Sequence, residues 1–218
     1  MADRVLLASG RSADVFAIDD GRVLRRYRDG GDATAEASIM AYAAAAGFPV
    51  PQVYEVDGAD LVMERLDGPT MLAALIAGDI GDRTGAELLA DLHDRLHALP
   101  APHSRSPGIG VLHLDLHPDN VILSPRGPVV IDWRNAAQGQ PDLDLAMSAV
   151  ILAQVAVDRT HDMAEAAGGF LTAFLSCAGG DPGRLLDDAL AMRRRDPALA
   201  TREIDLLNPA ATLIRDRL

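Results

Sequence analysis

Residues 110–133 read GVLHLDLHPDNVILSPRGPVVIDW, and the rest of the chain is organised around this stretch. A polar loop leads into two short apolar runs, residues 121–123 and 129–131, which flank a turn of Ser, Pro, Arg and Gly. Such runs around a Pro/Gly turn predict a β-hairpin. Asn120 would then precede one strand and Asp132 follow the other. Because these ends of an antiparallel pair lie side by side, an amide and a carboxylate oxygen there would share one hard cation.

Composition limits the classes of function. The chain has 218 residues, 49% of them hydrophobic, so it can bury a substantial core as one large domain or two small lobes. Its net charge of -12 argues against nucleic acid as a partner. Charged residues interrupt every apolar run well before the length of a membrane span, and no signal peptide is apparent. A single cysteine, Cys177, excludes an internal disulfide and favours a cytoplasmic protein.

The basic residues narrow the chemistry further. All 20 are arginines, and the sequence contains no lysine. A mechanism that requires a lysine is therefore excluded, including Schiff-base catalysis and the G-K-[ST] phosphate loop.

The first 66 residues have the pattern of a small antiparallel sheet. Strands are expected at residues 5–8, 14–18 and 22–27, with Asp20-Gly21 as a hairpin turn between the second and the third. A helix follows from Asp32 to about residue 46, where Gly47 ends it. The last two strands are expected at residues 54–56 and 61–66.

The remainder of the chain is mainly helical. Helical periodicity and end signals predict helices at residues 69–77, 84–99, 143–160, 163–177, 183–194, 201–207 and onward to 218. A Pro/Gly/Ser loop, residues 100–110, comes before the hairpin. The fold class is therefore α+β, with a small β-sheet lobe (residues 1–66) that carries one helix and a larger, mainly helical lobe (residues 67–218).

The loop and hairpin together resemble a known catalytic motif. His113, Asp115 and Asn120 fit H-x-D-x-x-x-x-N, and Asp132 follows twelve residues after Asn120. This resembles the catalytic loop and the D-F-G metal site of kinases. Trp133 and the His-Pro variant of the loop resemble specifically the aminoglycoside phosphotransferases and choline kinases, a family with a protein kinase-like fold. The competing interpretation is a loop that merely uses Asp and Asn to form turns.

The resemblance implies a role for each matched residue. Asp115 would accept or orient the proton of a substrate hydroxyl, and Asn120 and Asp132 would hold Mg²⁺ against the phosphates of ATP. His113 would shape the loop. His117 would either face the transferred phosphate or lie in solvent.

The small lobe would bind the nucleotide. Gly10 and Ser12 occupy the loop between the first two strands, where the family has its phosphate loop. Arg25 matches the family's strand-three lysine, and strand alternation turns it toward Glu36 on the helix. The alternative for Glu36 is a favourable interaction with the helix dipole. The segment around Glu64 would contact adenine through backbone groups.

Three further features have two interpretations each. His93 and His97 have the spacing of a zinc motif, although histidines beside a buried leucine stripe are more often part of a core. Asp144 would brace the catalytic loop, as in the family, or cap a helix, and the two roles are compatible at this position. Residues 193–195 form a run of arginines that we interpret as a solvated helix end.

We therefore expect an ATP- and Mg²⁺-dependent phosphotransferase that acts on a hydroxyl of a small molecule. The acceptor site is expected in the lobe that follows residue 66. Too few residues separate Asp132 from Asp142 for the long activation loop of a protein kinase. A cationic acceptor, such as an aminoglycoside or an amino alcohol, is suggested by the acidic residues of the later helices, which are Asp158, Asp162, Glu165, Asp187 and Asp188. The alternative is a nucleotide-binding pseudokinase or regulator, because Arg25 replaces the usual lysine.

Overall fold

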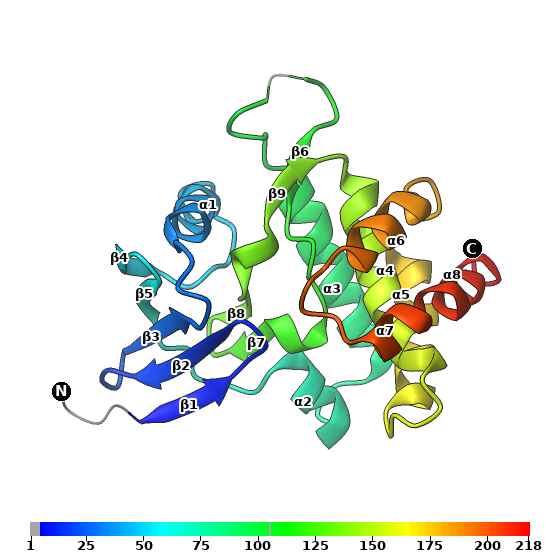
Figure 1. Ribbon diagram of the computed structural model, residues 1–218, viewed down its shortest axis with the longest axis horizontal. Helices are drawn as coiled ribbons and strands as arrows, with labels where there is room; N and C mark the ends of the chain where they lie inside the picture. Colours follow the sequence, from blue (N-terminus) through cyan, green and yellow to red (C-terminus); the bar gives the residue numbers. More distant parts are fainter. Residues whose placement is uncertain (1–4, 105) are drawn as a thin grey trace. The chain divides into compact units, whose positions relative to one another are not determined.

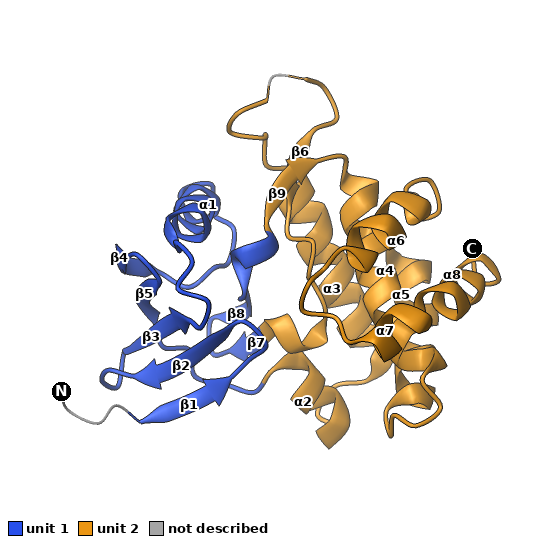
Figure 2. Cartoon of the chain, viewed as in Figure 1, with its two compact units in different colours: residues 1–69, 122–135 blue, residues 70–121, 136–218 orange. Residues whose placement is uncertain are grey.

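The computed structural model describes residues 5–104 and 106–218 (Figure 1). Two compact units divide the chain (Figure 2). Unit 1 comprises residues up to Pro69 together with Ile122–Asn135, and unit 2 comprises Thr70–Val121 and Ala136–Leu218. The expected lobes follow the order of the chain, whereas in the structure residues 122–135 pack with the first unit. Arg105, in the expected loop of residues 100–110, lies outside the described residues.

Unit 1 is built on a five-stranded antiparallel sheet. Its strands lie in the order β1-β2-β3-β5-β4, and every neighbouring pair is antiparallel. This confirms the expected sheet. The strands are β1 (Leu6–Ser9), β2 (Ala13–Ala17), β3 (Arg22–Tyr27), β4 (Val53–Asp57) and β5 (Asp60–Glu64).

The helix of unit 1, α1 (Thr34–Ala45), lies between β3 and β4 in the chain and packs against β4. The Asp32 carboxylate accepts a hydrogen bond from the Thr34 backbone N–H at 2.8 Å, so it assists the helix start although Ala33 is the capping residue. Gly47 has a φ of 82°, the left-handed conformation that ends helices. The helix presents Glu36 among its buried residues.

The predicted hairpin is present as a two-stranded sheet of β7 (Val121–Ser124) and β8 (Gly127–Val130). Short 3-10 turns precede and follow it, η1 (Pro118–Asn120) and η2 (Trp133–Asn135). Backbone hydrogen bonds anchor the hairpin in unit 1, because Leu123 N donates to Pro69 O and Val130 N donates to Pro49 O, both at 2.9 Å.

Trp133, which directly follows Asp132, is a core residue of unit 1. Its side chain is fully buried, it packs edge-on against Phe48 at 5.6 Å between ring centroids, and its Nε1–H donates to Val130 O at 2.9 Å. A buried aromatic ring of this size contributes much of the core of a small unit. The Trp133 side chain therefore anchors the segment that carries Asp132 to the core of unit 1.

Unit 2 is a helical assembly in which α4 packs against α5, α6 and α8, and α3 packs against α5. A short antiparallel pair of β6 (Gly110–Leu112) and β9 (Ala137–Gly139) adjoins the helices and was not predicted. The helices are α2 (Met71–Ala77), α3 (Asp82–His97), α4 (Pro141–Val157), α5 (Ala164–Cys177), α6 (Leu186–Arg194), α7 (Thr201–Asp205) and α8 (Leu207–Arg215).

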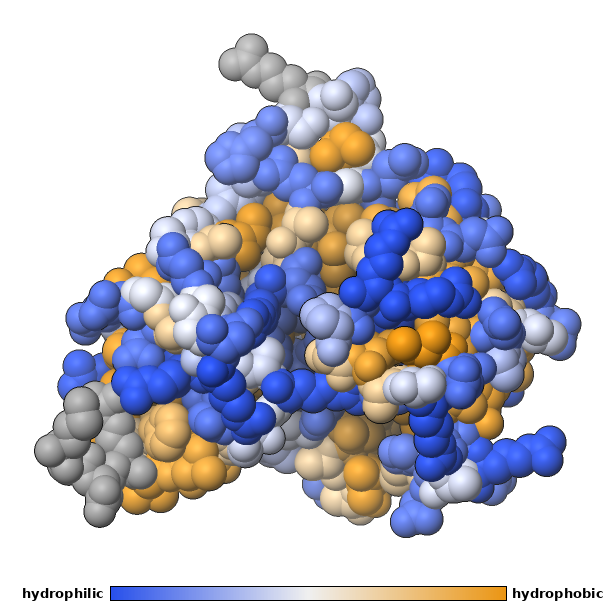
Figure 3. All heavy atoms as spheres, in the orientation of Figure 1, coloured by the Kyte–Doolittle hydropathy of each residue, from blue (hydrophilic) through white to orange (hydrophobic). Residues whose placement is uncertain are grey.

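The face drawn in Figure 3 is covered mainly by hydrophilic side chains, with apolar atoms visible between them. Among the described residues, none of the helices combines the length and the apolar character that a membrane span requires.

One glycine permits the close approach of β7 to the segment that leaves the sheet. Gly68 has a φ of 130°, and a Cβ atom built on it would lie 2.2 Å from the carbonyl oxygen of Leu123. Gly78 has a φ of 76°, but a Cβ atom there would meet nothing within 4 Å.

We predict that Gly68→Ala lowers the free energy of unfolding by about 3 kcal/mol, because conformational strain and a backbone clash add together. Gly78→Ala is the matched control and costs about 1 kcal/mol from strain alone. Urea unfolding of the two variants measures the difference. Equal losses would show that the contact with Leu123 is not close.

Candidate active site

The catalytic-loop residues of unit 2 form a cluster around Asp115. The side-chain nitrogen of Asn120 donates to the Asp115 backbone oxygen at 2.8 Å and lies 3.4 Å from its Oδ2. His117 Nε2 lies 3.8 Å from Asp115 Oδ1 and 3.2 Å from Asn120 Nδ2, while its Nδ1 accepts from Asp119 N. His117 therefore belongs to the cluster. Because Asn120 directs its nitrogen at Asp115, its side-chain oxygen faces away and is suited to a cation.

A buried carboxylate fixes the backbone just before Asp115. Asp144 accepts hydrogen bonds from His113 N at 3.0 Å and from Leu114 N at 2.6 Å, and its side chain is fully buried. Leu114 has a φ of 62°, a conformation that costs a non-glycine residue 1–3 kcal/mol in general. The two hydrogen bonds hold it there. Helix α4 has Gln140 at its N-cap position, so Asp144 acts as the brace and not as the cap.

Two histidines complete the brace. His97 Nε2 lies 2.9 Å from Asp144 Oδ2 and His93 Nδ1 lies 3.5 Å from it. His93 Nε2 contacts the Ser148 hydroxyl at 3.0 Å, which itself donates to Leu116 O at 2.6 Å.

These contacts decide between the two interpretations of the histidine pair. Potential ligand atoms of His93, His97 and Asp144 lie within 4.8 Å of one another. Both oxygens of Asp144 already accept backbone N–H groups, so the structure favours a polar core over a zinc site. Burial alone would raise the pKa of Asp144, but its hydrogen bonds with His93 and His97 outweigh burial and lower that pKa well below its usual value.

Arg25 is the central cation of unit 1. Its side chain is buried, its guanidinium forms an ion pair with the Asp132 carboxylate, and its Nε lies 3.6 Å from Glu36 Oε2. Arg26 points outward and pairs with Asp60, as strand alternation predicts. The expected pair of Arg25 and Glu36 is therefore present, and Asp132 is a closer partner of Arg25 than Glu36 is.

Glu36 does more than favour the helix dipole. Tyr27 OH donates to its Oε2, and Trp133 N donates to its Oε1 at 3.1 Å. Burial raises the pKa of Glu36, against the opposing effects of the Arg25 cation and the Tyr27 hydrogen bond. Asp132 has a φ of 63°, and Glu36 holds the residue that follows it. One buried carboxylate thus fixes the backbone next to a predicted metal ligand.

The expected phosphate loop is a tight turn. Gly10 N donates to Ala13 O at 2.9 Å, and Ser12 O accepts from Arg28 N at 3.0 Å. Arg28 also pairs with Asp14, whose pKa is lowered to about 2 by hydrogen bonds from Arg28 and Ser9. The role of Gly10 and Ser12 toward a phosphate stays a prediction.

The segment around Glu64 is partly committed to the sheet. Glu64 N donates to Gln52 O at 2.8 Å, and Arg65 N donates to Gly21 O at 2.9 Å. Because these two N–H groups already donate within the sheet, they are unavailable to adenine. The expected contact with adenine would have to come from other backbone groups of the segment. The Glu64 side chain pairs with Arg126 in the hairpin turn at 2.7 Å, a contact that the sequence did not predict.

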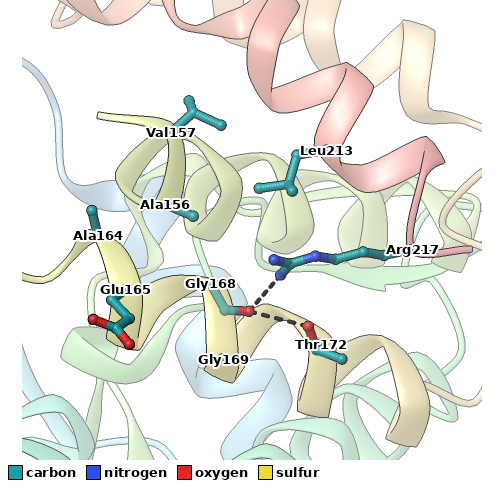
Figure 4. A pocket seen from close by; sticks show the side chains of 9 residues that line it. All are labelled: Ala156, Val157, Ala164, Glu165, Gly168, Gly169, Thr172, Leu213 and Arg217. Carbon is teal, nitrogen blue, oxygen red and sulfur yellow. Dashed lines mark hydrogen bonds between the residues drawn. The ribbon is translucent and has the colours of Figure 1, made fainter. Parts of the chain in front are cut away.

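A separate pocket of about 360 Å³ lies in unit 2 among the end of α4, the start of α5 and the end of α8 (Figure 4). Arg217 and Thr172 both donate to the Gly168 carbonyl oxygen beside it. Glu165, one of the acidic residues expected to attract a cationic acceptor, lines this pocket, whereas the residues predicted for catalysis and for metal and nucleotide binding do not.

The family follows from comparison with known proteins. A profile described as the phosphotransferase enzyme family matches residues 3–110 and 82–186. The chain belongs to this family. The match confirms the resemblance carried by the loop and hairpin motifs, and the predicted functional segments of this phosphotransferase-family protein lie within the matched residues. No curated protein sequence matches the chain.

Solved structures give the same fold at low sequence identity. The streptomycin–ATP–APH(2″)-IIa ternary complex has a TM-score of 0.63 and 13% identity, over 98% of this chain and 94% of the other. A choline/ethanolamine kinase family protein from Mesorhizobium loti has a TM-score of 0.61 and 15% identity, over 97% and 87%. Amicoumacin kinase hAmiN, in complex with AMP-PNP and Ca²⁺, has 0.59 and 14%, over 100% and 89%. The predicted class, α+β and protein kinase-like, is confirmed.

We predict that Asp144→Asn lowers the free energy of unfolding by about 3 kcal/mol at pH 7, because it removes the buried charge that His97 and two backbone N–H groups contact. The pKa of Asp144 is lower in the folded state than in the unfolded state. The ionised carboxylate therefore contributes its full stabilisation at pH values above the unfolded-state pKa, and this contribution is lost as the pH falls toward the folded-state pKa. The cost of the substitution should therefore shrink below about pH 4.

Denaturant unfolding at pH 7 and at pH 3 measures this change. Asp91→Asn is the control on the exposed side of α3, where its carboxylate pairs with Arg95, and it should change the stability little at either pH. A cost for Asp144→Asn that is independent of pH would contradict the prediction.

Proposed function

We propose that the protein is an ATP- and Mg²⁺-dependent phosphotransferase that transfers the γ-phosphate to a hydroxyl of a small molecule. The observation that carries the proposal is the cluster of Asp115 and Asn120 in a backbone held by Asp144. A loop that used Asp and Asn only for turns would need no such buried brace. The family match and the ATP and AMP-PNP complexes among similar folds support the same conclusion.

The donor set supports magnesium. Asn120 offers an amide oxygen and Asp132 a carboxylate, and oxygen ligands of this kind suit Mg²⁺. We propose that these two residues hold the ion. Mg²⁺, when bound, supplies neutralisation of the charge on the transferring phosphates. Arg25 holds Asp132 by its ion pair with Asp132 Oδ1.

Asp115 is proposed to orient the acceptor. Its carboxylate would accept the hydrogen bond of the acceptor hydroxyl and take its proton as transfer proceeds. The acceptor oxygen forms a bond to the γ-phosphorus, the bond from that phosphorus to the bridging oxygen breaks, and ADP leaves with the electron pair. The contribution of Asp115 is to align the hydroxyl for this in-line displacement.

Arg25 is proposed to replace the family's lysine. The role of that lysine is electrostatic positioning, and a guanidinium supplies the same charge with more donors in a fixed plane. The pair of Arg25 with Glu36 at 3.6 Å supports this proposal. A pseudokinase or regulator remains the alternative because the substitution at residue 25 is the feature that would weaken turnover.

The acceptor is proposed to be a small molecule, and the panel of charged and uncharged acceptors described below tests its charge. Of the acidic residues expected to attract a cation, Asp158 pairs with Arg202 and Asp187 pairs with Arg215. A cationic acceptor such as an aminoglycoside or amino alcohol therefore rests on the other three. Because ATP would be the donor, we propose that the protein acts in the cytoplasm.

A panel experiment tests the function. The protein is mixed with Mg-ATP and with aminoglycosides, amino alcohols, sugars and nucleosides in turn, and ADP release is measured. Release that depends on one acceptor supports the phosphotransferase. Binding of ATP without turnover across the panel would support the pseudokinase instead.

We predict that Asp115→Asn lowers kcat by about 10²- to 10⁴-fold, the usual contribution of a positioned base. Its affinity for Mg-ATP should stay within about three-fold, since Asp115 serves the acceptor. Asp119→Asn is the matched control, because Asp119 is an exposed residue of the same loop. Steady-state kinetics and titration with a fluorescent ATP analogue measure the two quantities. Turnover in Asp115→Asn equal to that of the control would remove the assigned role.

We predict a second difference on strand β3. Arg25→Met should reduce kcat/KM for Mg-ATP by about 100-fold or more, because it removes the cation that pairs with Asp132 and Glu36. Arg25→Lys should retain most activity if the requirement is for charge. Arg26→Met is the control, since Arg26 lies on the exposed side of the same strand. A normal kcat/KM in Arg25→Met would show that Arg25 does not replace the lysine.

A further inference from the structure

Arg193 is an arginine of unit 2 that the family match does not reach, because the matched residues end at 186. It lies in the last turn of α6, and its side chain is only 13% exposed. Its neighbours Arg194 and Arg195 are exposed. The interpretation of residues 193–195 as a solvated helix end therefore fits the latter two and is wrong for Arg193.

The guanidinium of Arg193 is held by contacts from separate elements. Its Nε donates to Gln154 Oε1 in α4 at 3.1 Å, and its Nη1 lies 3.5 Å from Asp196 Oδ2. Gln154 is buried and is itself fixed, because its Nε2 donates to Glu203 O in α7 at 2.8 Å. A buried amide placed in this way links the guanidinium to α4 and α7. In Figure 1, α6 lies beside α4, as their packing requires.

The held guanidinium faces the catalytic loop. Arg193 Nη1 lies 3.9 Å from Asp115 Oδ1, and the Asp115 side chain is 22% exposed. This separation exceeds that of a hydrogen bond, so the interaction between the two groups is electrostatic. On its other side, Asp115 Oδ2 faces Asn120 Nδ2 at 3.4 Å. The carboxylate thus has the Asn120 amide beside one oxygen, and His117 of its own loop and a cation from α6 beside the other.

We propose that Arg193 is a positioning residue for Asp115, which it holds by charge in the orientation that receives the acceptor hydroxyl. The inference rests on the proposed phosphotransferase function. It makes α6 part of the transfer site and assigns to this helix a role in catalysis. A purely structural Arg193 would instead serve to tie α4, α6 and α7 together.

Kinetics of the full-length protein separate these two roles. The substrates are Mg-ATP and the acceptor that the wild type phosphorylates in the panel, or water where ATP hydrolysis is the measured turnover. Arg193→Gln should lower kcat by about 10- to 100-fold, the effect of misplacing a reacting group, and leave the KM for Mg-ATP within about two-fold. Arg193→Lys should restore kcat to within about five-fold of the wild type, because the cation is retained.

Two other variants serve as controls. Arg194→Gln removes an exposed arginine from the same turn, where it contacts Asn208, and should behave as the wild type. Gln154→Leu removes the hydrogen bonds that link α4 to α6 and α7 but keeps the Arg193 cation. It should therefore lower the thermal unfolding midpoint as much as Arg193→Gln does, but reduce kcat less. If Arg193→Gln does not fold, Arg193→Lys decides: kcat within about five-fold of the wild type supports the role of the cation, and a larger loss overturns it.

The outcomes separate the two proposals. A wild type that releases no ADP with any acceptor or with water would overturn the phosphotransferase, and the role of Arg193 with it. A wild type that turns over while Arg193→Gln keeps kcat within about two-fold would overturn the role of Arg193 alone. Equal kcat losses in Arg193→Gln and Gln154→Leu would likewise overturn it, because they would report only the loss of the helix tie.

Discussion

The hydrogen bonds from two consecutive backbone N–H groups to the carboxylate of Asp144 are the constraint on which unit 2 depends. They keep Leu114 in a left-handed conformation that a leucine would otherwise leave, and this conformation sets the direction in which the chain enters Asp115. The carboxylate is fully buried, so its charge is tolerable only because histidines and backbone donors surround it. The histidine pair on α3, which has the spacing of a metal motif, is explained by the same requirement.

Unit 1 uses the same physical device. The buried carboxylate of Glu36 accepts the backbone N–H of Trp133, directly after Asp132, and Asp132 is the other non-glycine residue with a positive φ in the described chain. In each unit, a helix supplies a buried carboxylate that fixes a strained backbone next to a predicted site residue. Strain of this kind persists only where the surroundings over-determine it. Leu114 precedes Asp115 of the loop motif, and Asp132 is itself the carboxylate that ends the hairpin motif.

Local sequence patterns predict the secondary structure correctly where an element is defined by contacts between residues close in the chain. The strands, the hairpin and the long helices follow from periodicity and turn residues, and the pair of Arg25 and Glu36 follows from strand alternation combined with helical spacing. Pairings between distant segments were not visible. Strands β6 and β9 are three residues each and lie far apart in the chain, and Arg126 meets Glu64 only because the hairpin packs in unit 1. The burial of Arg193 does not follow from its sequence, because a helix pattern does not reveal which other element faces the last turn of the helix.

The absence of lysine has a consequence for how the protein can be modified. An ammonium group in a nucleotide site is a nucleophile when it loses its proton, and acylation removes its charge. The guanidinium of Arg25 does not deprotonate in proteins, and it is buried between two carboxylates. An amine-directed acylating reagent therefore has no target at residue 25. The positive charge that faces Asp132 is a permanent property of the chain, beyond the reach of acetylation.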